Sequence, residues 1–196
     1  MNKAKTMLKY HSIWDVKHLR KGLDGLYHII WEDHAVDRNI LHDTGEIAIL
    51  SAYFATGLAD YGAPPANLYL GLDARASLAE ADTLATINAA ELTAGGLGAK
   101  SGYERKALSS GGTGASGQDF YINQPAAYYR ADSKVVEWTA GEDWVTGLKN
   151  IFICSDEDAV ADGSDAHAIA SLALSATRTL LSGDKLQGSM YIGLSE

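Results

Sequence analysis

The sequence predicts a mainly β (α+β) fold, in which an antiparallel β-sandwich or jelly-roll-like body carries one packed N-terminal helix and an N-terminal arm. Short apolar or alternating segments recur along the chain, separated by Gly, Asp and Ser turn signals, a pattern typical of antiparallel sheets. Two of these segments, 68–72 and 190–194, share the pattern Tyr-x-Gly-Leu. Few helical segments stand between the strands, which argues against the crossover connections of a parallel sheet.

Length and the distribution of charge predict the domain organisation. A chain of 196 residues, 46% of them hydrophobic, is long enough for one domain with a substantial core,. Six Lys and Arg residues lie in the first 21 residues, against a single Asp. We therefore expect an N-terminal arm over residues 1–25, which is either a solvated tail or a basic segment that reaches an acidic partner. The rest, residues 26–196, is expected to form a single β-rich domain with a helix at about residues 44–56.

The overall charge excludes two classes of partner. A formal net charge of −9 is the wrong sign for binding nucleic acid, which requires a basic surface, and for binding an anionic membrane. No apolar stretch approaches the roughly 18 residues that a spanning helix requires, and no signal-peptide apolar region follows Met1,. We therefore expect a chain made in the cytoplasm without an export signal.

The first elements are a strand and a helix. Residues 26–35, with β-branched and aromatic side chains around Trp31, are expected to form a strand,. Asp43 or Thr44 can cap a helix, and Gly57 is a suitable stop. Apolar residues recur at helical spacing between them. The face that we expect this helix to bury against a sheet consists of Ile47, Leu50, Ser51 and Phe54.

After the break at Pro64-Pro65, strands and turns alternate to the end of the chain. The expected strands are 68–72, 102–108, 135–139, 151–154, 168–174 and 186–194. Residues 77–92 are expected to form a loop with one or two helical turns, and residues 109–118 a flexible loop. Turns are expected at residues 141–147 and at Gly183-Asp184. We expect the two Tyr-x-Gly-Leu strands to lie close together in one sheet, each Gly making room for a neighbouring ring or backbone.

The sequence offers no residues in a known catalytic, cofactor or metal arrangement. Residues 95–101 carry Ala99 where a phosphate loop requires Gly,. The acidic segment 156–165 carries Val160 where a calcium loop requires an oxygen ligand, so a solvated turn is expected, with a weak calcium site as the alternative,. The six histidines lack a zinc-binding spacing, and no Gly-x-Ser-x-Gly elbow occurs,. Cys154, in an apolar run, is expected to be buried and unreactive.

We therefore expect no catalytic residues, no cofactor and no enzyme activity. A hydrolase whose acids the sequence does not reveal is kept as a third hypothesis, behind two kinds of binding protein that follow from the resemblance below.

The order of the features resembles that of tailed-bacteriophage virion structural proteins, of the minor head, decoration or tail-associated class. The resemblance covers most of the chain from about residue 25 onward, and it lies in texture and order rather than in one defining motif. The strings that carry it are Trp31–His34, Asn39–Glu46, Leu68–Leu72, Gly102–Arg105, Trp138–Gly141 with Trp144, Asn150–Ile153 and Leu180–Asp184.

The resemblance implies a virion protein that is made in the host cytoplasm, needs no cofactor and has no catalytic residues. As a capsid decoration, cement or minor head protein it would associate with itself, with a trimer as the expected closed homo-oligomer, and would bind the major capsid protein or another virion protein. Buried aromatic surface is the expected means of association. The candidate interface residues are Trp14, Trp31, Trp138, Trp144, Tyr128 and Tyr129, and the four tryptophans are candidates for the core as well.

The alternative is a tail-associated module, at the tail tip or in a fibre, that binds a host glycan. This alternative predicts exposed Trp or Tyr side chains beside acids on a loop face. Cementing predicts instead that these aromatic residues are buried between chains, and that residues 1–25 contact a partner.

Overall fold

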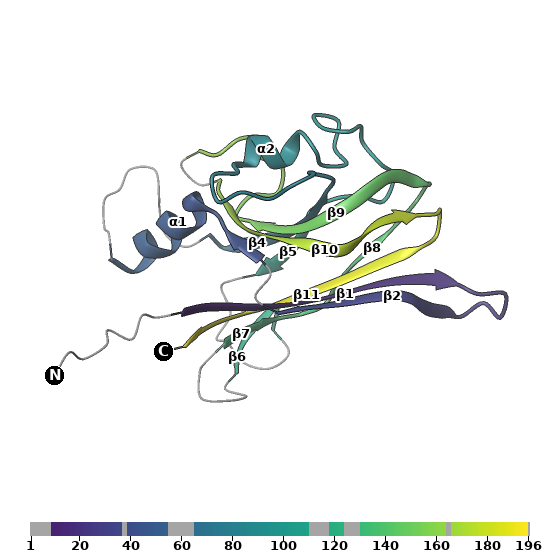
Figure 1. Ribbon diagram of the computed structural model, residues 1–196, viewed down its shortest axis with the longest axis horizontal. Coiled ribbons are helices and arrows are strands. Elements are labelled where there is room, and N and C mark those ends of the chain that lie inside the picture. Colours follow the sequence, from purple (N-terminus) through teal and green to yellow (C-terminus); the bar gives the residue numbers. More distant parts are fainter. Residues whose placement is uncertain are drawn as a thin grey trace.

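The computed structural model describes residues 9–36, 39–54, 65–109, 118–123, 130–163 and 166–195. Two antiparallel sheets lie face to face, with two helices beside one of them (Figure 1). The predicted mainly β fold with a sandwich body is therefore confirmed.

The first sheet, sheet A, has the strand order β2-β1-β11-β7-β6, and β8 pairs with the other half of β11. Its strands are β1 (Lys9–Lys21), β2 (Tyr27–Val36), β6 (Phe120–Asn123), β7 (Arg130–Ser133), β8 (Val136–Thr139) and β11 (Lys185–Ser195). Strands β1 and β2 form a hairpin, and β2 is an edge of the sheet.

The second sheet, sheet B, has the strand order β3-β10-β9-β4-β5. Its strands are β3 (Asn39–Leu41), β4 (Asn67–Asp73), β5 (Lys106–Ser109), β9 (Trp144–Cys154) and β10 (Ala168–Leu180). Helix α1 (Asp43–Phe54) follows β3, and the short helix α2 (Leu84–Asn88) lies over the outer face of sheet B (Figure 1).

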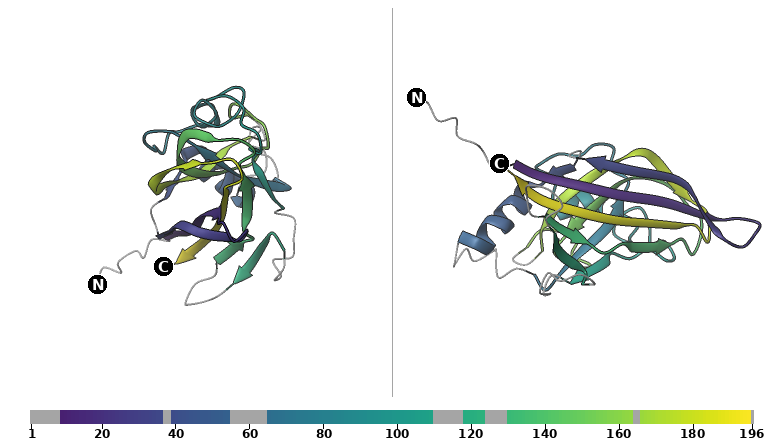
Figure 2. Two further views of the ribbon diagram at one scale, coloured as in Figure 1. Left: turned by 90° about the vertical axis from the view of Figure 1, so that its right-hand side faces the viewer. Right: turned by 90° about the horizontal axis from the view of Figure 1, so that it is seen from below.

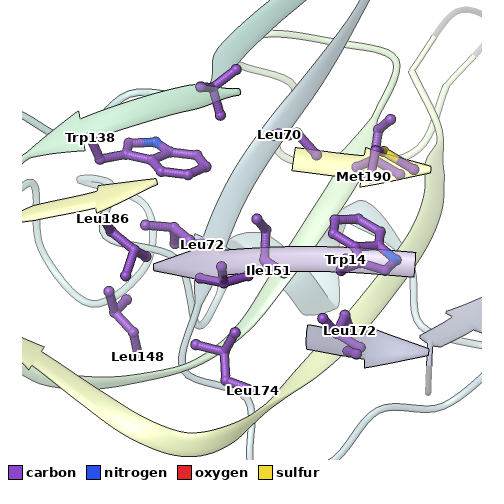
Figure 3. Packing of buried hydrophobic residues seen from close by; sticks show 14 of the residues in the cluster. Trp14, Leu70, Leu72, Trp138, Leu148, Ile151, Leu172, Leu174, Leu186 and Met190 are labelled. Atoms are coloured by element: carbon purple, nitrogen blue, oxygen red, sulfur yellow. The ribbon is translucent and has the colours of Figure 1, made fainter. Parts of the chain in front are cut away.

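The main core fills the space between the sheets. Trp14 and Met190 of sheet A meet Leu70, Ile151 and Leu172 of sheet B in one buried cluster (Figure 3). A second cluster lies on the other side of sheet B, where Phe152 and Cys154 pack against α2. Sheet B is thus covered on both faces, which accounts for the continuous apolar run at the end of β9.

The prediction of an N-terminal arm is wrong for those of its residues that the structure describes. Lys9–Lys21 form β1, an interior strand paired with both β2 and β11. The side chains of β1 alternate: Trp14, Val16 and His18 are buried, while Asp15 and Lys17 face outward,. Lys17 therefore belongs to the outer face of a strand, whereas Arg20 lies on the side of His18 and binds Asp184. Residues 1–8 lie outside the described part of the chain.

The prediction that the two Tyr-x-Gly-Leu strands share a sheet is also wrong. Tyr69 belongs to β4 in sheet B and Tyr191 to β11 in sheet A. The two strands contribute to the same core from opposite sides. The expected role of the glycine is confirmed for Gly71, because a Cβ atom there would lie 2.2 Å from Cζ of the Phe152 ring.

Helix α1 begins where expected but buries a different face. Its small residues face β10: Thr44 Oγ1 donates to the Ala168 carbonyl at 2.7 Å, and a Cβ on Gly45 would lie 2.4 Å from the Ile169 carbonyl oxygen. This close approach turns Ile47 outward, with 41% of its surface exposed, so its expected burial is wrong. The side chains of residues 50–54, and residues 55–64 with the expected stop, lie outside the described part of the chain.

The remaining elements largely match the predictions. Strands β2, β4, β8, β10 and β11 and the turn at Gly183-Asp184 are confirmed, and α2 supplies the helical turn expected within residues 77–92. Strand β5 is shorter than expected. Strand β9 starts at Trp144, inside the segment expected to turn. Of the expected loop at 109–118, residues 110–117 lie outside the described part.

Candidate functional site

The outer side of sheet B contains a serine–histidine pair, the arrangement that most resembles catalytic chemistry. His42 Nδ1 donates to the Ala79 carbonyl at 3.0 Å, which leaves Nε2 to accept from Ser171 Oγ at 2.8 Å. Arg75 Nη2 also donates to Ser171 Oγ, at 2.7 Å. Burial and the nearby Arg75 lower the pKa of His42, so the imidazole stays neutral at ordinary pH.

This pair is inaccessible to a substrate. The side chains of His42 and Ser171 are both fully buried, whereas a nucleophile must reach the atom that it attacks. The Arg75 guanidinium is held by the carboxylates of Asp73 and Asp82, at 2.8 and 2.7 Å. The network therefore anchors the loop after β4 to sheet B, which is a structural task.

A second buried network joins Glu91, Tyr103 and Arg105. The Arg105 guanidinium donates twice to the Glu91 carboxylate, at 3.0 and 2.7 Å, and its Nη1 donates to two carbonyls of the loop after β9. The Tyr103 hydroxyl donates to Glu91 as well. Burial, together with the Glu91 charge, raises the pKa of Tyr103 well above its usual value. These polar groups hold one another inside the protein and present no reactive atom to solvent.

The third network fixes the base of the β1–β2 hairpin. Asp184 accepts from Arg20 Nε at 2.9 Å, from Arg20 Nη2 at 2.7 Å and from the Leu181 amide at 2.9 Å, and it contacts His18 Nε2 at 2.9 Å. Burial alone would raise the pKa of Asp184, but the hydrogen bonds, with Arg20 first, lower it to about 2. Tyr27 adds a hydrogen bond to the Gly183 carbonyl at 3.1 Å.

Beyond this base the hairpin extends past the sandwich (Figure 2). Its apolar side chains are exposed, and we call them the hairpin patch: Leu23, Leu26, Tyr27, Ile29 and Ile30. A β-bulge opposite His18 and Leu19 leaves Ile30 without a partner residue on β1. Edge strands usually carry charges or prolines that discourage pairing, but residues 27–31 of β2 contain neither an acidic residue, a lysine nor a proline.

A second exposed surface lies on α1 and the loop beside it. At about 100° per residue, the side chains of Asp43, Glu46, Ile47 and Ile49 fall on one side of the helix, opposite the face that packs on β10. All four are exposed. The Asp43 amide donates to the Glu80 carbonyl at 3.0 Å, which places the exposed Glu80 beside them. We call these five residues the α1 patch.

Of the aromatic candidates, three lie in the core rather than at the surface. Trp14, Trp138 and Trp144 are fully buried in the core of the single chain. Trp31 is half-buried, and the Arg178 guanidinium carbon lies 4.8 Å from its ring centroid. Tyr128 and Tyr129 lie outside the described residues. Sequence reasoning missed the hairpin patch, although two leucines flanking the Asp24-Gly25 turn were a usable signal.

The acidic segment 156–165 and Cys154 have structural roles. Asp156 Oδ1 accepts from the amides of Asp158 and Ala159, and Asp162 accepts from those of Leu84 and Ala168. Within the described residues, no group of three or more His, Cys, Asp or Glu side chains is placed to hold a metal ion. Residues 164–165 lie outside them. The Cys154 thiol is buried as expected, and burial raises its pKa to about 12.

Comparison of the chain with protein-family models, curated proteins and solved structures finds no match. Among the described residues, neither helix has the length and apolar character needed to cross a membrane.

Proposed function

We propose that this chain is a bacteriophage virion structural protein of the minor head or capsid-decoration class. It is made in the host cytoplasm, associates with copies of itself and binds the major capsid protein. The observation that carries the proposal is the hairpin patch, an apolar surface on a projecting edge strand. Exposed apolar surface of this kind marks sites of association, and an unpaired edge offers backbone hydrogen bonds to a partner.

The polar networks support an assembly role over a catalytic one. The three networks centred on Arg75, Arg105 and Asp184 consist of side chains that hydrogen-bond one another or the backbone. Each joins segments far apart in the sequence, as a scaffold protein requires. Several large apolar side chains are also exposed, among them those of the hairpin patch, which favours binding over chemistry,.

The glycan-binding alternative receives less support. Stacking on a sugar ring requires an exposed aromatic face, and three of the four tryptophans are enclosed in the core. The face of Tyr27 is occupied by the ammonium of Lys185, 4.7 Å from the ring centroid. Tail-associated binding therefore remains the second candidate.

The proposal is tested by co-sedimentation with particles of the encoding phage assembled without this chain. We expect the wild-type protein to sediment with the particles in a fixed ratio. The double variant Ile29→Asp/Ile30→Asp is expected to lose at least tenfold in apparent affinity, the equivalent of about 1.4 kcal/mol. Val145→Asp, at an exposed position on β9, is the matched control and should bind like the wild type.

A wild-type protein that never sediments with particles would overturn the proposal. Binding of the same protein to host polysaccharide, without binding to particles lacking it, would favour the tail-associated module instead. Unchanged binding by the double variant would show that the hairpin patch does not bind the particle.

A further inference from the structure

The hairpin patch lies in a basic part of an acidic chain. Residues 17–30 contain Lys17, Arg20 and Lys21 against Asp24 alone, a formal charge of +2, so the rest of the −9 chain carries −11. Lys21 is exposed, and 42% of the Arg20 side chain remains exposed although Arg20 binds Asp184. The hairpin therefore combines exposed apolar side chains with the exposed positive charges of Lys21 and Arg20.

The α1 patch has the complementary character. Its apolar residues, Ile47 and Ile49, each expose 41% of their surface. They are accompanied by three exposed carboxylates, from Asp43, Glu46 and Glu80. Residues 39–54 contain no Lys or Arg, so the negative charge of this helix is not balanced by a basic side chain of its own segment.

The two patches lie at opposite ends of the molecule. Figure 1 shows α1 at one end and the tip of the β1–β2 hairpin at the other, and the perpendicular view in Figure 2 shows the same separation. One chain therefore cannot bring its own two patches together. A second copy can, because each copy presents an apolar surface accompanied by basic residues and an apolar surface accompanied by acidic residues.

We propose that copies of this chain associate head to tail, with the hairpin patch of one copy docked on the α1 patch of the next. The leucines and isoleucines of the hairpin cover Ile47 and Ile49, and Lys21 faces the carboxylates of α1. This inference rests on the proposed function, of which it names the self-associating surfaces. A contact between two different patches is heterologous, so it closes into a ring when the rotation per copy allows and otherwise continues as a filament.

The test uses two variants of the full chain, each altered on one patch at exposed positions. The hairpin variant is Lys21→Glu/Leu23→Asp, and the helix variant is Glu46→Lys/Ile47→Lys. Light scattering of the wild type should give a mass that is a multiple of the 20.9 kDa chain. Each variant alone should give the mass of one chain. Circular dichroism and the urea midpoint verify that both variants remain folded.

An equimolar mixture of the two variants is the decisive measurement. The hairpin variant retains an intact α1 patch and the helix variant an intact hairpin patch. The mixture should therefore associate, to a mass of at least twice that of the 20.9 kDa chain. The charge exchange Lys21→Glu with Glu46→Lys in one chain should restore association that either single change weakens. Val145→Asp should associate like the wild type.

Three outcomes would overturn head-to-tail association: a wild type that is a strict monomer, a mixture that stays monomeric, or a helix variant that associates normally. If the helix variant associates normally while the hairpin variant is monomeric, the hairpin patches of two copies pair about a two-fold axis, or the hairpin patch binds a different protein. Particle binding in the co-sedimentation experiment, with failure of the mixing experiment, rejects this inference and leaves the proposed function standing. Association in the mixing experiment without particle binding rejects the proposed function and leaves this inference standing.

Discussion

The Arg105 guanidinium and the Glu91 carboxylate form a two-point ion pair inside the protein, with side-chain exposures of only 2% and 0%. Removing one partner leaves the other charge buried and unpaired. Arg105→Met is therefore expected to lower the free energy of unfolding by about 3–5 kcal/mol, measured by urea denaturation.

Its control is the neighbouring pair of Lys106 and Glu104, in which the Glu104 side chain is 69% exposed. Lys106→Met should cost only about 0–1 kcal/mol, because an exposed pair is screened by water. Equal urea midpoints for the two variants would contradict the structural role assigned to Arg105.

The close approach of β4 to β9 depends on Gly71. In Gly71→Ala the new methyl group would meet the Phe152 ring at 2.2 Å from Cζ, and the ring is fully buried and unable to swing into solvent. We expect a loss of about 1–3 kcal/mol in the free energy of unfolding, typical of overpacking. Gly163→Ala is the control, because nothing lies within 4 Å of the added atom. An equally large loss in the free energy of unfolding of Gly163→Ala would reject the steric explanation.

Stability should fall in acid through Asp184. Its pKa of about 2 in the folded protein lies below the ordinary 3.8, so the contribution is present above about pH 4 and is lost as the pH falls toward 2. At 1.36 kcal/mol per pKa unit, the contribution of Asp184 to the free energy of unfolding amounts to about 2 kcal/mol.

The measurement is the free energy of unfolding in urea between pH 7 and pH 2, for the wild type and Asp184→Asn. The difference between them should shrink by about 2 kcal/mol over the acidic part of this range. Glu157→Gln, at an exposed loop position, is the control. A wild-type–variant difference that does not change with pH would contradict the role of the Asp184 charge.

The Cys154 thiol should be unreactive in the folded protein. It is buried, its pKa is raised to about 12 by burial, and its Sγ donates to the Asp156 carbonyl at 3.2 Å. Because the thiolate is the reactive form, a thiol reagent should label the native chain negligibly at pH 7.5. Labelling should rise with urea along the unfolding curve measured by fluorescence. Rapid labelling before that transition would show that the strand end at Cys154 opens locally.

The sequence by itself determined most of the elements, because strand and turn signals are local, but it did not reveal β1, β3, β6 and β7. Alternation and β-branched content located β2, β8 and β11, Gly183-Asp184 located a turn, and an apolar run located the buried Cys154. The mainly β class followed from the number of such segments. These properties depend on residues within a few positions of one another, which is why they can be read from the chain alone.

Only the tertiary structure decided which surfaces meet. It placed Tyr69 and Tyr191 in different sheets, made an interior strand of residues 9–21 and enclosed Trp14 in the core. Strand partners are chosen among segments far apart in the sequence, by the packing of whole faces, so local pattern does not reveal them. The same holds for α1, whose buried side was set by the contact of Gly45 with β10. That contact leaves isoleucines outside, on the surface that we propose a second copy covers.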